Sequence, residues 1–163
     1  MLNFEVETLM KIFLSLLLTL FASMPVLAEQ EKFDAREFAQ KYFDVWSSTQ
    51  APDASADDIE AYLALLTDDV GHQHLPYDPD SARDPEGKNR MREGMTYYLG
   101  AHSEYRSSLD EVLVGFDVVV IKYNTFVKAT HPQTGELIER SGEMVEVLEL
   151  ENDKVSVIRK YSE

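Results

Sequence analysis

The segment IEAYLALLTDDVGHQHL, residues 59–75, changes from one hydrophobic period to another and decides the fold. Apolar residues recur in its first half at spacings of three and four: Ile59, Tyr62, Leu63 and Leu66. That spacing predicts an amphipathic helix over residues 56–66. The second half, residues 70–75, alternates and is too short for a helix, so we expect a strand there.

The flanking segments extend this pattern in both directions. Upstream, residues 33–49 place an apolar face at helical spacing: Ala35, Phe38, Ala39, Tyr42, Val45 and Trp46. Downstream, the three prolines of residues 76–87 predict a loop, and residues 88–102 predict a third helix. We expect the loop to form a rim or lid over a binding pocket.

The rest of the chain is rich in β-branched and aromatic residues and predicts four strands joined as a meander. Their expected ranges are 103–115, 116–130, 137–151 and 154–163. Helices followed by consecutive strands indicate an α+β fold with an antiparallel sheet. Apolar residues on both faces of residues 118–121 favour a second covered face, so we expect a homodimer.

The N-terminus predicts a secretory signal. Residues 10–28 begin with Met10 and a lysine, continue as an uncharged apolar run and end in small residues at Ala28. Glu5 and Glu7 are atypical of such a signal, so Met10 is a candidate true start. We expect cleavage after Ala28, a mature domain over residues 29–163 and a periplasmic or secreted location; a retained membrane anchor is the alternative.

The composition excludes several classes of partner and chemistry. The chain has 30 acidic and 15 basic residues and a net charge of −15, which disfavours nucleic acid and anionic membrane surfaces. It has no cysteine, so disulfides, thiolate metal sites and cysteine nucleophiles are excluded.

The helix-to-strand run IEAYLALLTDDV and the closing DKVSVIRKYSE resemble the nuclear transport factor two-like superfamily, which includes SnoaL-like domains and ketosteroid isomerases. The resemblance covers residues 33–163. It implies a cone-shaped, cystatin-like roll, in which the three helices pack in the concave face of a curved sheet around an apolar pocket. The superfamily hosts many reactions and also non-catalytic binders, so the fold alone does not name a reaction.

The resemblance to ketosteroid isomerases implies three catalytic residues. The first-helix tyrosine falls on Tyr42 and the acid of the penultimate strand on Glu146. The base falls on His74, where those enzymes have aspartate. His74 would abstract a proton, and Tyr42 and a protonated Glu146 would donate hydrogen bonds to the developing oxyanion. The alternatives are a core role for Tyr42 and a solvated Glu146.

Further residues are expected to line the pocket. Strand alternation puts His72 and His74 on the face of the apolar Val70. The predicted lining set is His72, Trp46, Met144 and Tyr98. The alternative for the two histidines is a hydrogen-bonded pair at the wet end of the sheet, without a role.

A metal site is the alternative to this interpretation. His72 and His74 could share a metal with His102, but an H-x-H pair is a weak signal. The acidic residues of the loop lack the spacing of a calcium-binding loop. We therefore expect no metal and no cofactor.

The sequence thus predicts an exported domain that binds a small apolar molecule and performs acid–base isomerase, cyclase or hydrolase chemistry without a cofactor. The alternative is a non-catalytic module that binds a small ligand or mediates protein interaction, including dimerisation.

Overall fold

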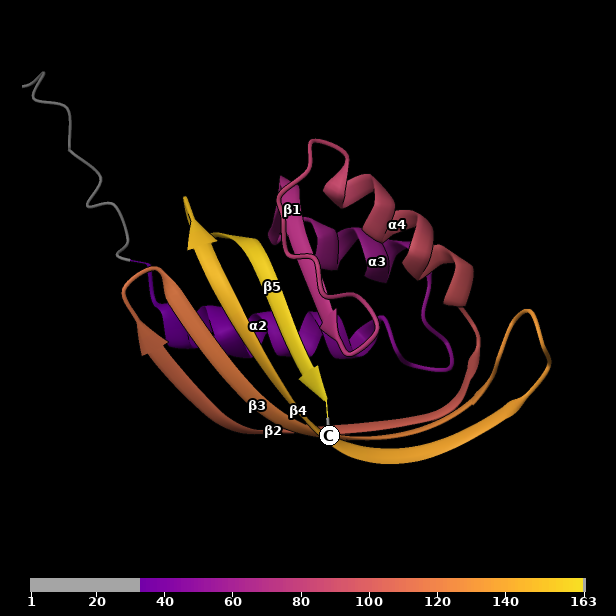
Figure 1. The fold of residues 1–163 in the computed structure, drawn as a ribbon. Helices are drawn as coiled ribbons and strands as arrows, with labels where there is room; N and C mark the ends of the chain where they lie inside the picture. The colour runs from indigo at the N-terminus through magenta and orange to yellow at the C-terminus, as the bar shows by residue number, and fades with distance from the viewer. Residues whose placement is uncertain (1–32, 163) are drawn as a thin grey trace, which may run out of the picture. The chain divides into compact units, whose positions relative to one another are not determined.

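The computed structural model describes residues 33–162 (Figure 1). The predicted signal, residues 1–28, lies outside the described residues. Three helices and five strands follow in the predicted order: α2 (Ala35–Ser48), α3 (Ala56–Leu63), β1 (Leu66–Leu75), α4 (Gly87–Tyr98), β2 (His102–Gly115), β3 (Val118–Thr130), β4 (Leu137–Glu151) and β5 (Lys154–Ser162). No helix within residues 33–162 is both long enough and apolar enough to cross a membrane.

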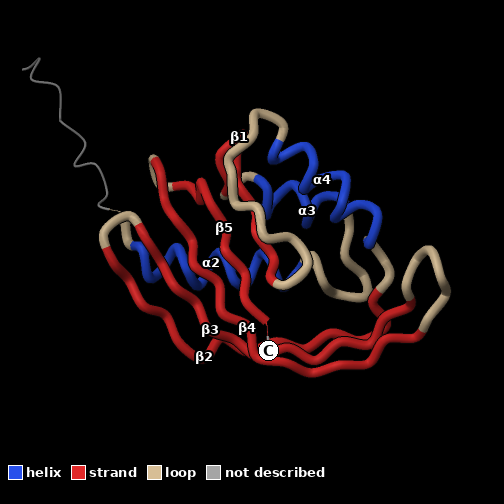
Figure 2. Tube along the Cα trace, viewed as in Figure 1, coloured by secondary structure: helices blue, strands red, loops and turns tan. Residues whose placement is uncertain are grey.

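The strands form one curved sheet in the order β1-β5-β4-β3-β2, with the helices on its concave side (Figures 1 and 2). The α+β class with packed helices is confirmed. The sheet differs from a fully antiparallel one at its edge, because β1 pairs with β5 in parallel. A parallel pair needs a long crossover, and α4 with the β2–β4 meander supplies it.

Helix α2 begins at a side-chain cap and buries one face. The Asp34 carboxylate accepts hydrogen bonds from the backbone N–H groups of Arg36 and Glu37 at 2.9 and 3.1 Å. The buried residues of α2 are Phe38, Ala39, Tyr42 and Phe43. They follow the predicted apolar face and join the inner sides of β3, β4 and β5 in the core.

The boundary between helix α3 and strand β1 lies earlier in the chain than the sequence predicts. The helix ends at Leu63, and the strand begins at Leu66 rather than at residue 70. Leu66 pairs with Val155 of β5, and the Val155 N–H donates to the carbonyl of Leu65 at 2.9 Å. This pairing partner lies far along the chain, so local periodicity cannot reveal it.

Strand β5 contains a bulge that changes which of its residues face the helices. Leu150 pairs with Val155, but Glu149 pairs with Val157, so Ser156 is one residue too many. The Ser156 hydroxyl donates to the Glu149 carbonyl at 3.1 Å. Inward-facing positions on β5 are therefore odd-numbered before the bulge and even-numbered after it.

Most of the loop over residues 76–86 does not cover the concave side. Its part from Pro79 to Ala82 packs on the opposite face of β1, where a Cβ atom on Gly71 would meet the carbonyl oxygen of Ser81 at 2.3 Å, whereas Tyr77 at its start lies beside His74. Gln73, on that same face, donates to the Pro79 carbonyl at 2.9 Å. Figure 2 shows the loop running back along β1 toward α4. The predicted lid is therefore corrected to a segment fastened to the outer face.

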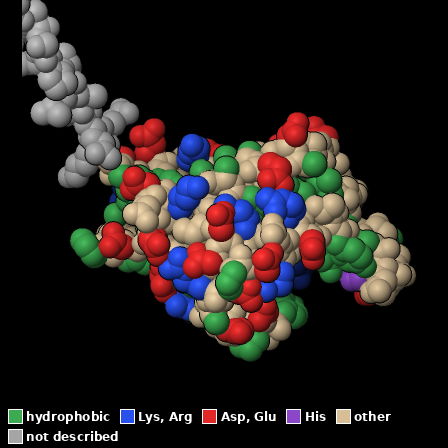
Figure 3. Space-filling view, turned by 90° about the horizontal axis from the view of Figure 1, so that it is seen from above, with side chains coloured by type: hydrophobic (Ala, Val, Ile, Leu, Met, Phe, Trp, Pro, Cys, Tyr) green, Lys and Arg blue, Asp and Glu red, His purple; other side chains and the backbone are tan. Residues whose placement is uncertain are grey.

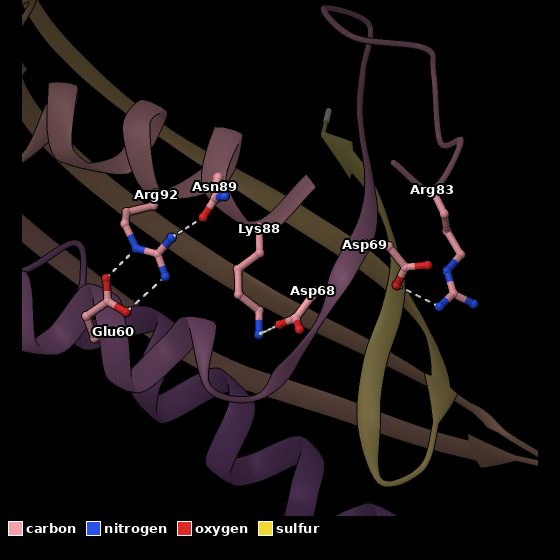
Figure 4. A network of polar contacts seen from close by, with 7 residues as sticks. All are labelled: Glu60, Asp68, Asp69, Arg83, Lys88, Asn89 and Arg92. Carbon is pink, nitrogen blue, oxygen red and sulfur yellow. Dashed lines mark hydrogen bonds and ion pairs between the residues drawn. The ribbon is translucent and has the colours of Figure 1, made fainter. Parts of the chain in front are cut away.

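Ion pairs fasten this loop and helix α4 to their neighbours (Figure 4). Arg83 bridges Asp69 and Glu151 at 2.7 and 2.5 Å. Lys88 pairs with Asp68 at 2.7 Å, and Arg92 with Glu60 at 2.5 Å. Acidic and basic side chains also intermingle over the face seen in Figure 3. Most of these groups are half-exposed, so each pair contributes at most about 1 kcal/mol.

Candidate functional site

The centre of the concave face carries a row of polar side chains on three adjacent strands. The strand register pairs His74 of β1 with Lys160 of β5, and Lys160 with Glu146 of β4. The same register places Ile121 of β3 beside Glu146. The row therefore meets the apolar core at Ile121 and reaches the sheet edge at His74.

Glu146 is 2% exposed, and its carboxylate contacts two hydroxyl groups and one ammonium group. The Tyr42 hydroxyl donates to its Oε2 at 2.8 Å, and the Tyr123 hydroxyl donates to its Oε1 at 2.6 Å. The Lys160 Nζ lies 3.2 Å from Oε1. The hydroxyls of Tyr42 and Tyr62 are 2.9 Å apart. Because Tyr42 gives its only proton to the carboxylate, Tyr62 donates to Tyr42.

The environment keeps Glu146 ionised. Burial acts to raise the pKa of this carboxyl, but the Lys160 ammonium and the hydrogen bonds from Tyr123 and Tyr42 outweigh burial, and the pKa is lowered. Burial and the Glu146 charge raise the pKa values of Tyr42 and Tyr123, so both hydroxyls stay protonated. We call Tyr42, Tyr62, Tyr123, Glu146 and Lys160 the buried network.

In this geometry the carboxylate of Glu146 is an acceptor, whereas its expected role calls for a donor. The prediction required a protonated acid that donates to an oxyanion, but the carboxylate is ionised and accepts every hydrogen bond it makes. The Tyr42 proton is also directed at Glu146. Tyr42 and Glu146 do lie together as the resemblance implied, but they satisfy each other.

Lys160 is the member of the buried network that the sequence pattern does not reveal. Its ammonium lies 4.4 Å from the centre of the Trp46 ring and 5.8 Å from that of Tyr123, within cation–π range. The two-residue turn before β5 pairs Glu151 with Lys154, and an unbroken register from there would set Glu146 opposite Arg159. Only the bulge at Ser156 brings Lys160 opposite Glu146.

His72 and His74 share the inner face of β1, as the alternation predicted. Their ring centres are 6.3 Å apart, and that of Tyr77 lies 5.5 Å from that of His74. Burial lowers the pKa of His72, and burial with the Lys160 charge lowers the pKa of His74 to about 4. Both are neutral at pH 7. Neither imidazole makes a hydrogen bond to a group within residues 33–162.

The predicted lining residues divide into two groups. Trp46 contacts Tyr105 and Tyr123, with ring centres 6.1 and 5.1 Å away, and Met144 is the strand neighbour of Tyr123. Both lie beside the buried network. Tyr98 lies apart from it, because its 50% exposed ring packs on Tyr97 and on His131 of the β3–β4 turn.

The candidate metal ligands named in the sequence do not come together in the structure. Among residues 33–162 no group of three or more histidine, aspartate or glutamate side chains could hold a metal ion. His102 stacks on Tyr105 of the edge strand β2, whereas His72 lies on β1 at the opposite edge. In the loop, Asp78, Asp80 and Asp84 accept hydrogen bonds from backbone N–H groups two residues further on.

Comparison with known proteins found one family model, that of the SnoaL-like domain, which matches residues 39–158. No curated protein matches the chain.

Several solved structures share the fold. An LEH-like epoxide hydrolase of M. tuberculosis is 11% identical, with a TM-score of 0.57, and the match covers 78% of this chain and 84% of that one. A ketosteroid isomerase-like protein of Erwinia carotovora atroseptica is 17% identical, with a TM-score of 0.53 and coverages of 78% and 92%. A cystatin-fold protein of Novosphingobium aromaticivorans is 18% identical, with a TM-score of 0.57 and coverages of 77% and 95%. At these identities the likeness establishes the fold alone.

Proposed function

We propose that this chain, which belongs to the SnoaL-like domain family, binds a small, largely apolar molecule on its concave face and moves a proton on it through His74. One observation carries the proposal. Two neutral imidazoles without a hydrogen bond to the described protein stand on the inner face of β1, beside the cation of Lys160. The resemblance to the nuclear transport factor two-like superfamily, confirmed by the family match, supports an apolar ligand.

The low basicity of His74 limits the substrate. An imidazole whose pKa is about 4 is neutral at pH 7 but accepts a proton weakly. It can therefore deprotonate only an acidic carbon, such as one that lies between two carbonyl groups. The reaction class that fits is enolisation, followed by isomerisation or ring closure, of a small dicarbonyl compound.

Lys160 takes the electrostatic role that the resemblance gave to Tyr42 and Glu146. Its ammonium is fixed between Glu146 and the Trp46 ring, so it need not reorganise when an enolate oxygen develops nearby. The buried network then acts as a rigid support that positions this cation. Its tyrosines do not touch the substrate in this scheme.

Deuterium exchange tests this function. A small 1,3-dicarbonyl compound that keeps its C2 hydrogen in neutral water, such as ethyl 2-methylacetoacetate, is incubated in D2O with wild-type protein or with His74→Gln, and uptake at C2 is followed by NMR. We expect faster exchange with wild-type protein than with either His74→Gln or buffer alone. Equal exchange in all three, with binding retained, would contradict proton transfer.

Binding without turnover is the second candidate, and a specific observation favours it. The protons of Tyr42 and Tyr123 are both committed to Glu146, so no tyrosine of the network is free to assist a reaction. The same experiment decides between the two: bound but unexchanged ligand supports a carrier.

We also propose that the domain is exported, on the evidence of residues 10–28. The test is the mass of the protein recovered from the periplasm after expression of the whole sequence in a bacterial host. A chain that begins at Glu29 is expected. Full-length protein in the cytoplasm would contradict export.

The convex face supports the proposal of a homodimer. Leu113, Val120 and Val147 are neighbours on β2, β3 and β4 on that face and are partly or well exposed. Light scattering should give twice the chain mass for wild-type protein and a lower mass for Val147→Asp. A wild-type monomer would contradict this interface.

A further inference from the structure

We infer that the ligand of the concave face carries a carboxylate, and that Arg140 of β4 binds it. This inference rests on the proposed function and adds the chemical class of the ligand. It concerns the outer part of the concave face, away from the buried network and toward the β3–β4 turn.

The register places Arg140 on the concave side. Arg140 shares the alternation of Glu146 and Leu148, which are both buried under the helices, and β4 pairs with β3 without a register shift from Leu137 to Glu149. Across the sheet, Arg140 is the neighbour of Val127, and Val127 is the neighbour of Tyr105. Tyr105 contacts Trp46, so the row of Arg140 lies on the same face as the proposed ligand site.

Arg140 has no acidic partner among the described residues. In this acidic chain most basic groups on the sheet are paired, including Lys122 with Glu143 and Lys128 with Glu139. Arg140 is exposed and makes neither an ion pair nor a side-chain hydrogen bond within residues 33–162. A guanidinium presents a planar set of donors that matches one carboxylate, and here that partner is not supplied by the protein.

The positive charge of Arg140 acts on two histidines. Its charge contributes to lowering the pKa values of both His74 on β1 and His102 on β2. His102 stacks on Tyr105, and the strand register places Tyr105 in the same row as Arg140. We call His74, His102 and Arg140 the rim. The neutral imidazole of His74 can donate an N–H group, so the rim offers one positive charge and a further donor to a bound anion.

The charges of the rim fit a ligand that carries a single negative charge. One unpaired guanidinium with neutral imidazoles compensates a single negative charge, whereas a phosphate dianion would remain uncompensated in a protein with a net charge of −15. The aromatic surface of Trp46 extends from Lys160 to Tyr105 and can cover the apolar body of the ligand. The geometry thus fits an apolar acid with its carboxylate at Arg140.

A matched pair of probes tests the inference. Octanoate and octanamide have the same apolar chain, and only the first is charged. Trp46 is the only tryptophan of the chain and lies in the site, so its fluorescence reports binding of either probe. The protein is expressed from the full sequence. We expect wild-type protein to bind octanoate at least about tenfold more tightly than octanamide, as a charged hydrogen bond implies.

Two variants assign the preference. Arg140→Gln should bind both probes equally, with the affinity for octanamide unchanged. Arg36→Gln, which removes an exposed arginine in the first turn of α2, should keep the preference for octanoate. Equal binding of both probes by wild-type protein would overturn the inference but leave the proposed function intact. A preference that survives in Arg140→Gln would overturn the assignment to Arg140, and no fluorescence response to either probe would contradict the proposed function itself.

Discussion

The buried network and the rim lie on the same face of one sheet, but they differ in whether their polar groups have hydrogen-bond or ion-pair partners in the protein. In the network, Glu146 receives two hydroxyl hydrogen bonds and an ammonium, all from the protein. In the rim, the imidazole of His74 and the guanidinium of Arg140 make no hydrogen bond or ion pair with residues 33–162. Satisfied buried polar groups stabilise a fold, and unsatisfied accessible ones are available to a ligand. The comparison therefore separates residues that hold the structure from the candidate binding residues.

The largest expected effect comes from removing the cation of the network. Lys160→Met leaves the Glu146 carboxylate buried with only the tyrosine hydroxyls, so we expect a loss of about 3–5 kcal/mol in the free energy of unfolding, measured with urea. The control is Lys122→Met, which breaks a half-exposed pair with Glu143 and should cost less than about 1 kcal/mol. A loss of under about 1 kcal/mol in Lys160→Met would mean that the network is not the structural centre described.

A smaller effect is expected from one hydroxyl of the network. Tyr123→Phe removes a 2.6 Å hydrogen bond to a charged group and should cost about 1.5–3 kcal/mol in urea unfolding. Tyr97→Phe is the control, because the Tyr97 ring is 49% exposed and its hydroxyl makes no hydrogen bond to residues 33–162. Its removal should be neutral or slightly stabilising. Equal losses in the two variants would show that the hydrogen bond is not the cause.

The histidines predict a pH dependence that the network does not share. The pKa of His72 is lowered and that of His74 is about 4 in the folded protein, against about 6.5 in the unfolded chain. Between these values the unfolded chain binds more protons, so the free energy of unfolding should fall as the pH drops from 6.5 toward 4 and stay constant above it. His102 adds to the same trend.

Urea unfolding at pH 7.5, 6 and 5 measures this dependence. The double variant His72→Gln/His74→Gln should show a shallower fall than wild-type protein. Glu146, whose lowered pKa contributes stability that is lost only below about 4.5, does not titrate in this range. Identical slopes in the two proteins would mean that the histidines are not held neutral by the fold.

The smallest effect on stability is expected at the rim. At pH 8, His74→Gln and Arg140→Gln should each change the free energy of unfolding by less than about 0.5 kcal/mol, because neither side chain has a hydrogen bond or ion pair within residues 33–162 to lose. Denaturant unfolding of both variants checks this. A loss above about 1 kcal/mol in either would place that residue with the network and remove it from the candidate binding groups.

Periodicity predicts the order of the helices and strands and the inner face of β1, because each depends on residues close in sequence, but it misplaces the boundary between α3 and β1. The parallel pairing of β1 with β5 was not predictable in this way, since its partners are far apart in the chain. Tyr42 and Glu146 were found through the resemblance, but their protonation depends on Lys160, which no local pattern places beside them. The loop over residues 76–86 was misplaced because prolines identify a loop without indicating which face it covers.

Ser156 has a consequence for how this domain tolerates insertions and deletions. Ser156 is the extra residue of the bulge, so deleting it would leave Glu149 opposite Val157 and Glu146 opposite Lys160 and would remove only the bulge. One more residue between Ser156 and Ile158 would instead act like a frame shift within β5, because Ile158 and Lys160 would turn outward. This strand should therefore tolerate the loss of one residue at position 156 better than the gain of one.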